Sequence, residues 1–216
     1  GQPRPASGWD ALIHVLEKCG PEGGLQGSNT MKEGADMPIR AELHCHTNAS
    51  DGVLDAAELL KRASAIGLNR VVITDHDTCR GYLSVRDRSF KGLVCYPGIE
   101  ISSEAGSYDA HVLGYFVDVD DERLSDACMQ AVRLRTNRTL QMMERLSDAG
   151  YPCSLEEMHA QGYTVVNRSN LARMLVAHGD ASSVNDAFST FLSSRSPYYV
   201  PLRYMDVRDA IHLIAS

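Results

Sequence analysis

The sequence lacks a segment that could cross a membrane or direct secretion. No run among its 216 residues approaches the roughly 18 consecutive apolar residues that a transmembrane helix needs. Residues 1–20 contain a short apolar stretch, but they lack the basic start, apolar middle and small-residue cleavage site of a secretory signal. We therefore expect a cytoplasmic protein that has no membrane partner.

The sequence also lacks grouped cysteines. No two of its six cysteines have CxxC spacing, whereas a structural zinc site or a disulfide framework groups them more tightly. We therefore expect free and mostly buried thiols. Cys45 lies between two histidines, and we expect it to pack behind them and not to act as a nucleophile.

An excess of basic residues is missing as well. The formal net charge is -7 at pH 7, whereas sequence-independent binding of nucleic acid depends on a basic surface. We therefore expect no binding to duplex DNA. The charge is still compatible with a nucleotide that a few arginines hold beneath metal ions.

Residues 1–38 are predicted to be an N-terminal extension. A short helix is expected from Trp9 to Lys18, and a Gly-rich polar stretch without periodicity follows it. Met31 or Met37 could be an internal start, in which case the preceding residues would be vector-derived or an alternative extension. The segment could equally be disordered.

Residues 39–120 have the pattern of an α/β protein. Residues 54–67 have the apolar spacing of a helix, and strands are expected within residues 39–47, 70–77, 92–102 and 110–118. A strand, a helix and a second strand in this order indicate parallel pairing with a crossover helix. Polar groups at the ends of such strands are typical of a barrel or an open α/β sheet, whose loops build the site.

Residues 121–195 are predicted to form an inserted helical lobe. Helices are expected at residues 121–150, 154–162, 169–179 and 183–194. Ser154 and Ser183 are the expected N-caps of two of them. Residues 196–201 resemble a strand that returns to the sheet, and residues 205–216 begin another helix. The chain stops partway through this α/β pattern.

Histidine and carboxylate side chains recur near the predicted strand ends. His44 and His46 are two residues apart at the end of the first strand, so both imidazoles project to one side and can reach one ion. The next strands and loops add Asp51, Asp75, His76, Asp77, Glu100, which ends a strand, and His111, which opens another. These ligand types suit Zn, Mn or Fe. Their placement along one rim of a sheet favours a shared metal site over separate turn, cap and surface roles.

These motifs resemble those of the PHP (polymerase and histidinol phosphatase) family. In chain order they are His44-Cys45-His46, Ser50-Asp51-Gly52, Thr74-Asp75-His76-Asp77, Gly98-Ile99-Glu100 and His111-Val112-Leu113-Gly114-Tyr115. The helical lobe, with Arg168-Ser169-Asn170-Leu171-Ala172-Arg173 in its middle, is most similar to the branch of nucleoside 3',5'-bisphosphate phosphatases and 5'-to-3' exoribonucleases. The match runs from about Ile39 to the end of the chain.

The resemblance implies a distorted (β/α)7 barrel of the PHP type that holds two or three divalent ions (Mn, Zn or Fe) at the carboxyl ends of its strands. It assigns metal-ligand roles to His44, His46, Asp51, His76, Glu100 and His111. Glu100 is expected to bridge two ions. The implied substrate is a small phosphate ester or nucleotide, such as a 3',5'-bisphosphonucleotide or the 5' end of a short RNA.

Two departures from the family pattern affect this expectation. The family has Arg-Pro-His where this chain has Arg168-Ser169-Asn170, so Asn170 replaces a histidine ligand. An amide oxygen can coordinate a metal, but it is a weaker donor than imidazole for zinc-like ions. The chain also ends before the alanine-histidine-proline strand and the closing aspartate-x-histidine motif of the family. We therefore expect an incomplete barrel in which at least one ion lacks protein ligands.

The expected reaction is hydrolysis by a metal-activated water, which requires no Ser or Cys nucleophile. Asp75 or Asp77 would orient a ligand histidine or protonate the leaving group. Arginines would bind a second phosphate or the nucleotide through bidentate hydrogen bonds. The candidates are Arg135, Arg138, Arg168 and Arg173.

Two alternative functions stay open. The substrate could be histidinol phosphate or another small phosphomonoester, although the helical lobe favours the nucleotide branch by analogy. Alternatively, the protein could be a degenerate PHP module that binds metal or a partner without turnover. Asn170 and the missing C-terminal motifs motivate that second reading.

Overall fold

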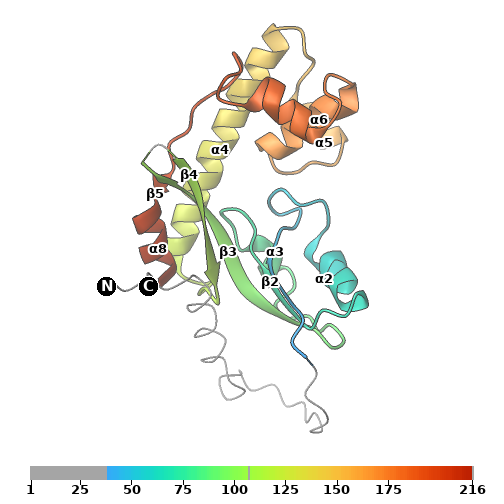
Figure 1. The fold of residues 1–216 in the computed structure, drawn as a ribbon, viewed down its shortest axis with the longest axis vertical. Helices are drawn as coiled ribbons and strands as arrows, with labels where there is room; N and C mark the ends of the chain where they lie inside the picture. The colour runs from blue at the N-terminus through green and yellow to red at the C-terminus, as the bar shows by residue number, and fades with distance from the viewer. Residues whose placement is uncertain (1–37, 107, 216) are drawn as a thin grey trace, which may run out of the picture. The chain divides into compact units, whose positions relative to one another are not determined.

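The computed structural model of the chain describes residues 38–106 and 108–215, which begin with a strand, a helix and a second strand. These are β1 (Ala41–Cys45), α2 (Ala56–Ala65) and β2 (Arg70–Ile73) (Figure 1). Asp55 caps α2 by accepting a hydrogen bond from the amide of Glu58. β1 and β2 pair in parallel, which confirms the expected α/β fold with a parallel sheet. The helix predicted from Trp9 to Lys18 lies outside the described residues.

β3 (Val94–Ala105) changes its partner partway along its length. Residues 94–97 pair in parallel with β2, and residues 98–105 pair antiparallel with β4 (Tyr108–Tyr115). The change falls at Gly98, where a Cβ atom would come within 2.4 Å of Cγ1 of Val72. The missing side chain therefore permits the close approach of β3 to β2 at this point.

The helices after β4 follow the sequence prediction. They are α4 (Glu122–Asp148), α5 (Leu155–Ala160), α6 (Arg168–His178), α7 (Val184–Ala187) and α8 (Val207–Ala215). The hydroxyls of Ser154 and Ser183 accept hydrogen bonds at the starts of α5 and α7, which confirms both as N-caps. A π-helix, η1 (Phe188–Leu192), continues α7, and a short helix, α3 (Arg80–Leu83), which the sequence did not predict, follows β2.

The strand expected at residues 196–201 is wrong. These residues form turns and irregular chain, because Pro197 and Pro201 lack the N–H group that a strand ladder requires. The chain returns to the sheet at β5 (Met205–Asp206), which pairs in parallel with the far end of β3.

α4 links the sheet to the helical lobe. It is the long helix that runs from the β3–β4 hairpin towards α5 and α6 (Figure 1), and its 27 residues extend over about 40 Å. Leu124 near its start packs in one buried cluster with Ile99 of β3, and Leu146 near its end packs in another with Leu171 of α6. Side chains on α4 and α6 can therefore reach the loops of the sheet. Within the described residues, no helix is both long and apolar enough to span a bilayer.

Candidate metal centre

Two histidines at the end of β1 lie against one carboxylate. Nε2 of His44 is 3.0 Å, and Nε2 of His46 is 2.8 Å, from Oε2 of Glu100. The two Nε2 atoms are 3.1 Å apart. The two-residue spacing therefore brings both imidazoles to one point, as the strand periodicity predicted. Only 3% of Glu100 is exposed, so the carboxylate forms the buried floor of this group.

Glu100 and His111 reach this point from the β3–β4 hairpin. We expected Glu100 to end a strand and His111 to open another, and this is wrong because both lie inside longer strands. β3 continues past Glu100 to pair with β4, where His111 lies opposite Ser102. Ser102 and Glu100 share one face of β3 because side chains alternate along a strand. Nδ1 of His111 accordingly lies 2.6 Å from Oε1 of Glu100.

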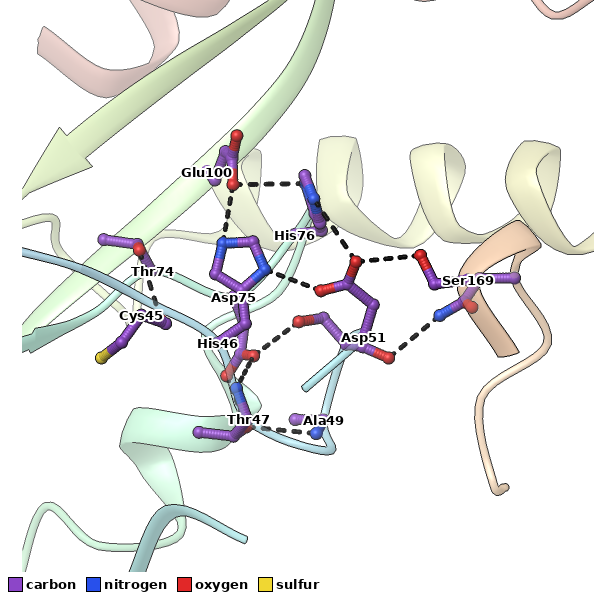
Figure 2. Close-up of polar contacts among 12 residues, drawn as sticks. Cys45, His46, Thr47, Ala49, Asp51, Thr74, Asp75, His76, Glu100 and Ser169 are labelled. Atoms are coloured by element: carbon purple, nitrogen blue, oxygen red, sulfur yellow. Dashed lines mark hydrogen bonds and ion pairs between the residues drawn. The ribbon is translucent and has the colours of Figure 1, made fainter. Parts of the chain in front are cut away.

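His76 and Asp51 complete the cluster (Figure 2). His76 follows β2 and forms an isolated parallel bridge with Glu100, which places its Nδ1 3.5 Å from Oε2 of Glu100. Asp51 lies in the loop after β1, with Oδ1 2.7 Å from Nδ1 of His46 and Oδ2 3.9 Å from Nε2 of His76. Side chains from separate segments thus meet around two carboxylates.

The donor atoms form three overlapping groups, each with its ligand atoms within 4.8 Å of one another. The groups are His44-His46-Glu100, His46-Asp51-His76 and His76-Glu100-His111. Among the described residues, the buried Nδ1 of His76 has no hydrogen-bond partner, an unusual state for a buried nitrogen that a bound cation would relieve. Imidazole and carboxylate donors in this number suit Zn, Mn or Fe. The residues therefore fit a cluster of divalent ions.

Electrostatics keep both carboxylates of the cluster ionised. Burial opposes ionisation of Asp51, but its hydrogen bond with His46 lowers the pKa of the carboxyl to about 2. Burial also opposes ionisation of Glu100, yet hydrogen bonds with His111 and His46 hold its pKa far below the usual range. Burial would lower the pKa of His46, but the same carboxylates raise it to about 9. The pKa of His76 falls to about 4, chiefly through burial. Both carboxylates are thus ionised, and His46 holds a proton that a bound cation would displace.

Asp75, a predicted catalytic residue, holds the loop that carries Asp51 through hydrogen bonds. Its Oδ1 accepts hydrogen bonds from the amide of Thr47 (2.7 Å) and the hydroxyl of Ser50 (2.6 Å), and its Oδ2 accepts one from the hydroxyl of Thr47 (2.7 Å). Burial nevertheless raises the pKa of this carboxyl. A Cβ atom at Gly81 would lie 2.0 Å from Oδ2, so the carboxylate is enclosed tightly. These contacts hold the loop, and a role in proton transfer stays a prediction.

Asp77, the other predicted catalytic residue, holds Arg135 of α4 beside the cluster. Oδ2 of Asp77 accepts hydrogen bonds from Nη1 of Arg135 (2.6 Å) and from the hydroxyl of Ser102 (2.9 Å), and Oδ1 accepts one from the amide of Ser102 (2.8 Å). The φ of Asp77 is 52°, a left-handed conformation that non-glycine residues seldom adopt. Hydrogen bonds of Asp77 thus connect the strained turn after His76 to both β3 and α4.

The N-cap and the N-terminal half of α6 form hydrogen bonds with the loop that carries Asp51. Asn167 caps the helix and donates a hydrogen bond to the carbonyl of Ser50 at 3.0 Å. Ser169 donates its hydroxyl to Oδ2 of Asp51 at 3.1 Å (Figure 2), and Arg173 donates to the carbonyl of Asp51 at 2.8 Å. Sequence reasoning missed the roles of Asn167 and Ser169. Their position at the start of a helix was an available signal for both residues.

Asn170, which we expected as a replacement ligand, is 5% exposed and engaged elsewhere. Its amide oxygen accepts a hydrogen bond from Nη1 of Arg173 at 2.7 Å, and its amide nitrogen donates to the carbonyl of Val165 at 2.8 Å. The oxygen that would coordinate a metal thus already accepts one hydrogen bond, from Arg173. The ligand role of Asn170 stays a prediction.

Arg135 lines a cavity of about 280 Å³ beside the cluster, and the wall of this cavity also includes Asp51, His76 and Arg80. Arg80 was not identified from the sequence, although its place in the loop after Asp77 was an available signal. An arginine beside two proposed ligands is well placed to bind an anionic substrate.

The other three predicted substrate arginines make contacts within the protein. Arg138 is buried and lies over the ring of Tyr204. Arg168 lies over the ring of Phe188, and Arg173 holds the Asp51 loop as described above. Substrate binding by these three residues stays a prediction.

Cys45 packs behind the histidines, as expected. Its Sγ donates to the carbonyl of Val72 at 3.2 Å, and burial raises the pKa of the thiol to about 12. The described cysteines, which exclude Cys19, are all free thiols. A thiol this weakly acidic is a poor nucleophile at neutral pH.

An α/β fold that gathers imidazoles and carboxylates beside a parallel sheet defines a metal-binding α/β protein. The family model described as PHP domain matches residues 42–166. The chain therefore belongs to the PHP domain family, as its motifs predicted.

Similar proteins carry nucleotide-related names. The 5'-3' exoribonuclease Rnm of Escherichia coli is 35% identical over 178 residues, which make up 80% of this chain and 60% of that protein. The 3',5'-nucleoside bisphosphate phosphatase of Chromobacterium violaceum is 28% identical over 174 residues, 79% of this chain and 61% of that protein. A solved structure from Bifidobacterium adolescentis, suggested to be a metal-dependent phosphoesterase, has a TM-score of 0.76 and 31% identity, covering 83% of this chain and 65% of that one. The chain thus spans about 60% of the length of the two curated relatives.

Proposed function

We propose that the chain carries the metal-binding part of a phosphoesterase that hydrolyses a phosphate ester of a nucleotide. The observation that carries this proposal is the convergence of four imidazoles with the carboxylates of Asp51 and Glu100. The adjoining cavity presents Arg80 and Arg135 to an anion. The names of the Escherichia coli and Chromobacterium violaceum relatives support a nucleotide substrate, either a 3',5'-bisphosphonucleotide or the 5' end of a short RNA.

The proposed cofactor is a set of two or three divalent ions, Mn, Zn or Fe. The two oxygens of Glu100 face different histidines, since Oε2 is near His44 and His46 and Oε1 is near His111. This arrangement suits a carboxylate shared by two ions. Asp51 and His76 would supply the remaining ligands. When bound in such a cluster, divalent ions lower the pKa of a water molecule and neutralise phosphate oxygens.

The protein's own residues would position the substrate and the ligands. Arg135 would bind a phosphate oxygen while Asp77 fixes the orientation of its guanidinium. Arg80, on the same cavity wall, would bind a further oxygen or a second phosphate. Asp75 and the first turn of α6 would keep Asp51 in place through the bonds described above.

We also propose that the described sheet is the opening part of a distorted seven-stranded barrel. The support is the parallel order β1-β2-β3 with proposed ligands after the ends of β1 and β2. In this proposal, residues 1–38 form an N-terminal extension, residues 39–120 the first part of the barrel, residues 121–195 the helical lobe and residues 196–216 the return to the barrel. A crystal structure of the full-length protein would test this, and an open sheet in that structure would contradict it.

The activity is tested by measuring phosphate release from adenosine 3',5'-bisphosphate and from histidinol phosphate. The full-length protein would be purified without chelators and assayed with Mn, Zn or Fe. We expect release from the nucleotide that EDTA abolishes, and at least tenfold lower kcat/KM for histidinol phosphate, which cannot use a nucleotide site. Faster hydrolysis of histidinol phosphate would contradict the substrate assignment. Metal binding without release from either compound would indicate a module that does not turn over.

A further inference from the structure

A second cavity adjoins the candidate site and is lined by residues of α4. Its volume is about 300 Å³, and it shares Thr78, Arg80 and Val132 with the cavity beside the metal cluster. Beyond these shared residues, its wall includes Leu83, Met129 and Arg133. We name this second cavity the α4 groove. Because the two cavities share wall residues, the α4 groove lies directly beside the cavity at the cluster.

One face of α4 forms a wall along both cavities. Ser125, Met129 and Val132 line the α4 groove, and Val132 and Thr136 line the cavity beside the cluster. These spacings of three and four residues place the side chains on one helix face. With a rise of about 1.5 Å per residue, the stretch from Ser125 to Thr136 extends over roughly 16 Å. Each cavity is close to the lower end of the roughly 300–1,000 Å³ typical of small-molecule sites.

The α4 groove combines unpaired cations with exposed apolar surface. Within the described part of the chain, the guanidinium groups of Arg80 and Arg133 are exposed and have no ion-pair or hydrogen-bond partner. Val132 and Met129 are 40% and 49% exposed. No acidic residue lines the α4 groove except Asp77, which is buried and paired with Arg135. This is a locally basic strip on a chain with a formal net charge of -7.

We propose that the α4 groove binds the second nucleotide of a single-stranded oligonucleotide whose terminal phosphate ester lies at the metal cluster. This proposal rests on the proposed function. Arg133 binds the internal phosphate, and Met129 and Val132 pack against the base. Proteins that bind single strands without reading sequence combine a cationic groove with side chains against which the bases pack, and here the exposed side chains of Met129 and Val132 provide that surface. The natural substrate is therefore an oligonucleotide, and a mononucleotide fills only the first cavity.

The experiment compares a mononucleotide with a trinucleotide on the full-length protein. Arg133→Glu should raise the KM for a 5'-phosphorylated RNA trinucleotide roughly fivefold or more, because an attraction becomes a repulsion. Its KM for adenosine 3',5'-bisphosphate should not change. Lys61→Glu is the matched control: it makes the same change of charge at an exposed position of α2 and lines neither cavity. Neither KM should change in the control.

A binding measurement without metal separates this proposal from the proposed function. Fluorescence anisotropy with a labelled trinucleotide on the metal-free protein should show weaker binding for Arg133→Glu, and a salt slope smaller by about 0.7. Met129→Glu should weaken binding as well. Equal effects on both substrates, no effect on either, or an equal effect of Lys61→Glu would overturn the proposal. If the wild type hydrolyses neither substrate with metal, the proposed function fails, while the anisotropy result still decides the α4 groove.

Discussion

The metal-free protein should be most stable near pH 6.5, because two histidines of the cluster have pKa values shifted in opposite directions. The pKa of His46 is about 9 and that of His76 is about 4, against 6.5 for an unperturbed histidine. The side chains of His46 and His76 are only 18% and 10% exposed, so solvent screens these interactions weakly. Each pKa differs from 6.5 by about 2.5, which corresponds to about 3 kcal/mol.

The two shifts act on opposite sides of the optimum. As the pH rises from 6.5 to about 9, the unfolded chain has already released a proton that His46 retains in the folded state, so the free energy of unfolding falls. As the pH falls from 6.5 to about 4, the unfolded chain binds a proton at His76 that the folded state excludes, so the free energy of unfolding falls again. Protonation of Asp51 and Glu100 adds to the loss only at more acidic pH.

Thermal unfolding at pH 5, 6.5 and 8.5, in buffer with EDTA, measures this effect. For a chain of this size, about 3 kcal/mol corresponds to a change in Tm of roughly 6–12 °C. Saturating Mn should move the optimum to higher pH, because the metal displaces the proton from His46. His46→Asn should remove the alkaline decrease, whereas His212→Asn, at an exposed position of α8, should leave it. A metal-free Tm at pH 8.5 that equals or exceeds the Tm at pH 6.5 would contradict the raised pKa of His46.

Three further predictions concern single residues. Glu100→Gln removes the negative charge that the histidines of the cluster contact. It should weaken Mn binding at least 100-fold in calorimetry, since even the hydrogen-bond partners of metal ligands contribute 10–100-fold to affinity. An unchanged Mn affinity would contradict the proposed role of Glu100 as a metal ligand. Arg173→Ala removes the hydrogen bond to the carbonyl of Asp51. It should weaken Mn binding roughly tenfold, with little loss of helix content in circular dichroism. A loss of helix content without a change in Mn affinity would indicate a structural role only. Gly81→Ala places a Cβ atom 2.0 Å from Oδ2 of Asp75 and should destabilise the protein by about 1–3 kcal/mol in urea unfolding. An unchanged free energy of unfolding would show that the chain around Gly81 can move to accommodate the methyl group.

Local patterns in the sequence were sufficient to predict the parts of the site that depend on neighbouring residues. The side-chain alternation of a strand predicted that His44 and His46 face one point, and the structure places both within 3.0 Å of Glu100. The preference of serine for helix starts predicted the N-caps Ser154 and Ser183. Such features depend on residues a few positions apart, so one sequence is enough to find them.

Contacts between distant segments were not predictable in the same way. Arg173 and Asp51 are 122 residues apart, and Arg135 and Asp77 are 58 residues apart. These contacts depend on how α4 and α6 pack against the sheet, which no local pattern specifies. The change of pairing partner at Gly98 was missed for a similar reason, because it depends on which strands lie beside β3 in the folded sheet.

Anomalous diffraction from crystals of the full-length protein loaded with Mn would locate the proposed ions directly. We expect at least two peaks near Glu100, each roughly 2.0–2.2 Å from a carboxylate oxygen and from an imidazole nitrogen of the cluster. Data in which no peak lies within coordination distance of Glu100 would contradict the metal cluster and the hydrolysis proposed from it.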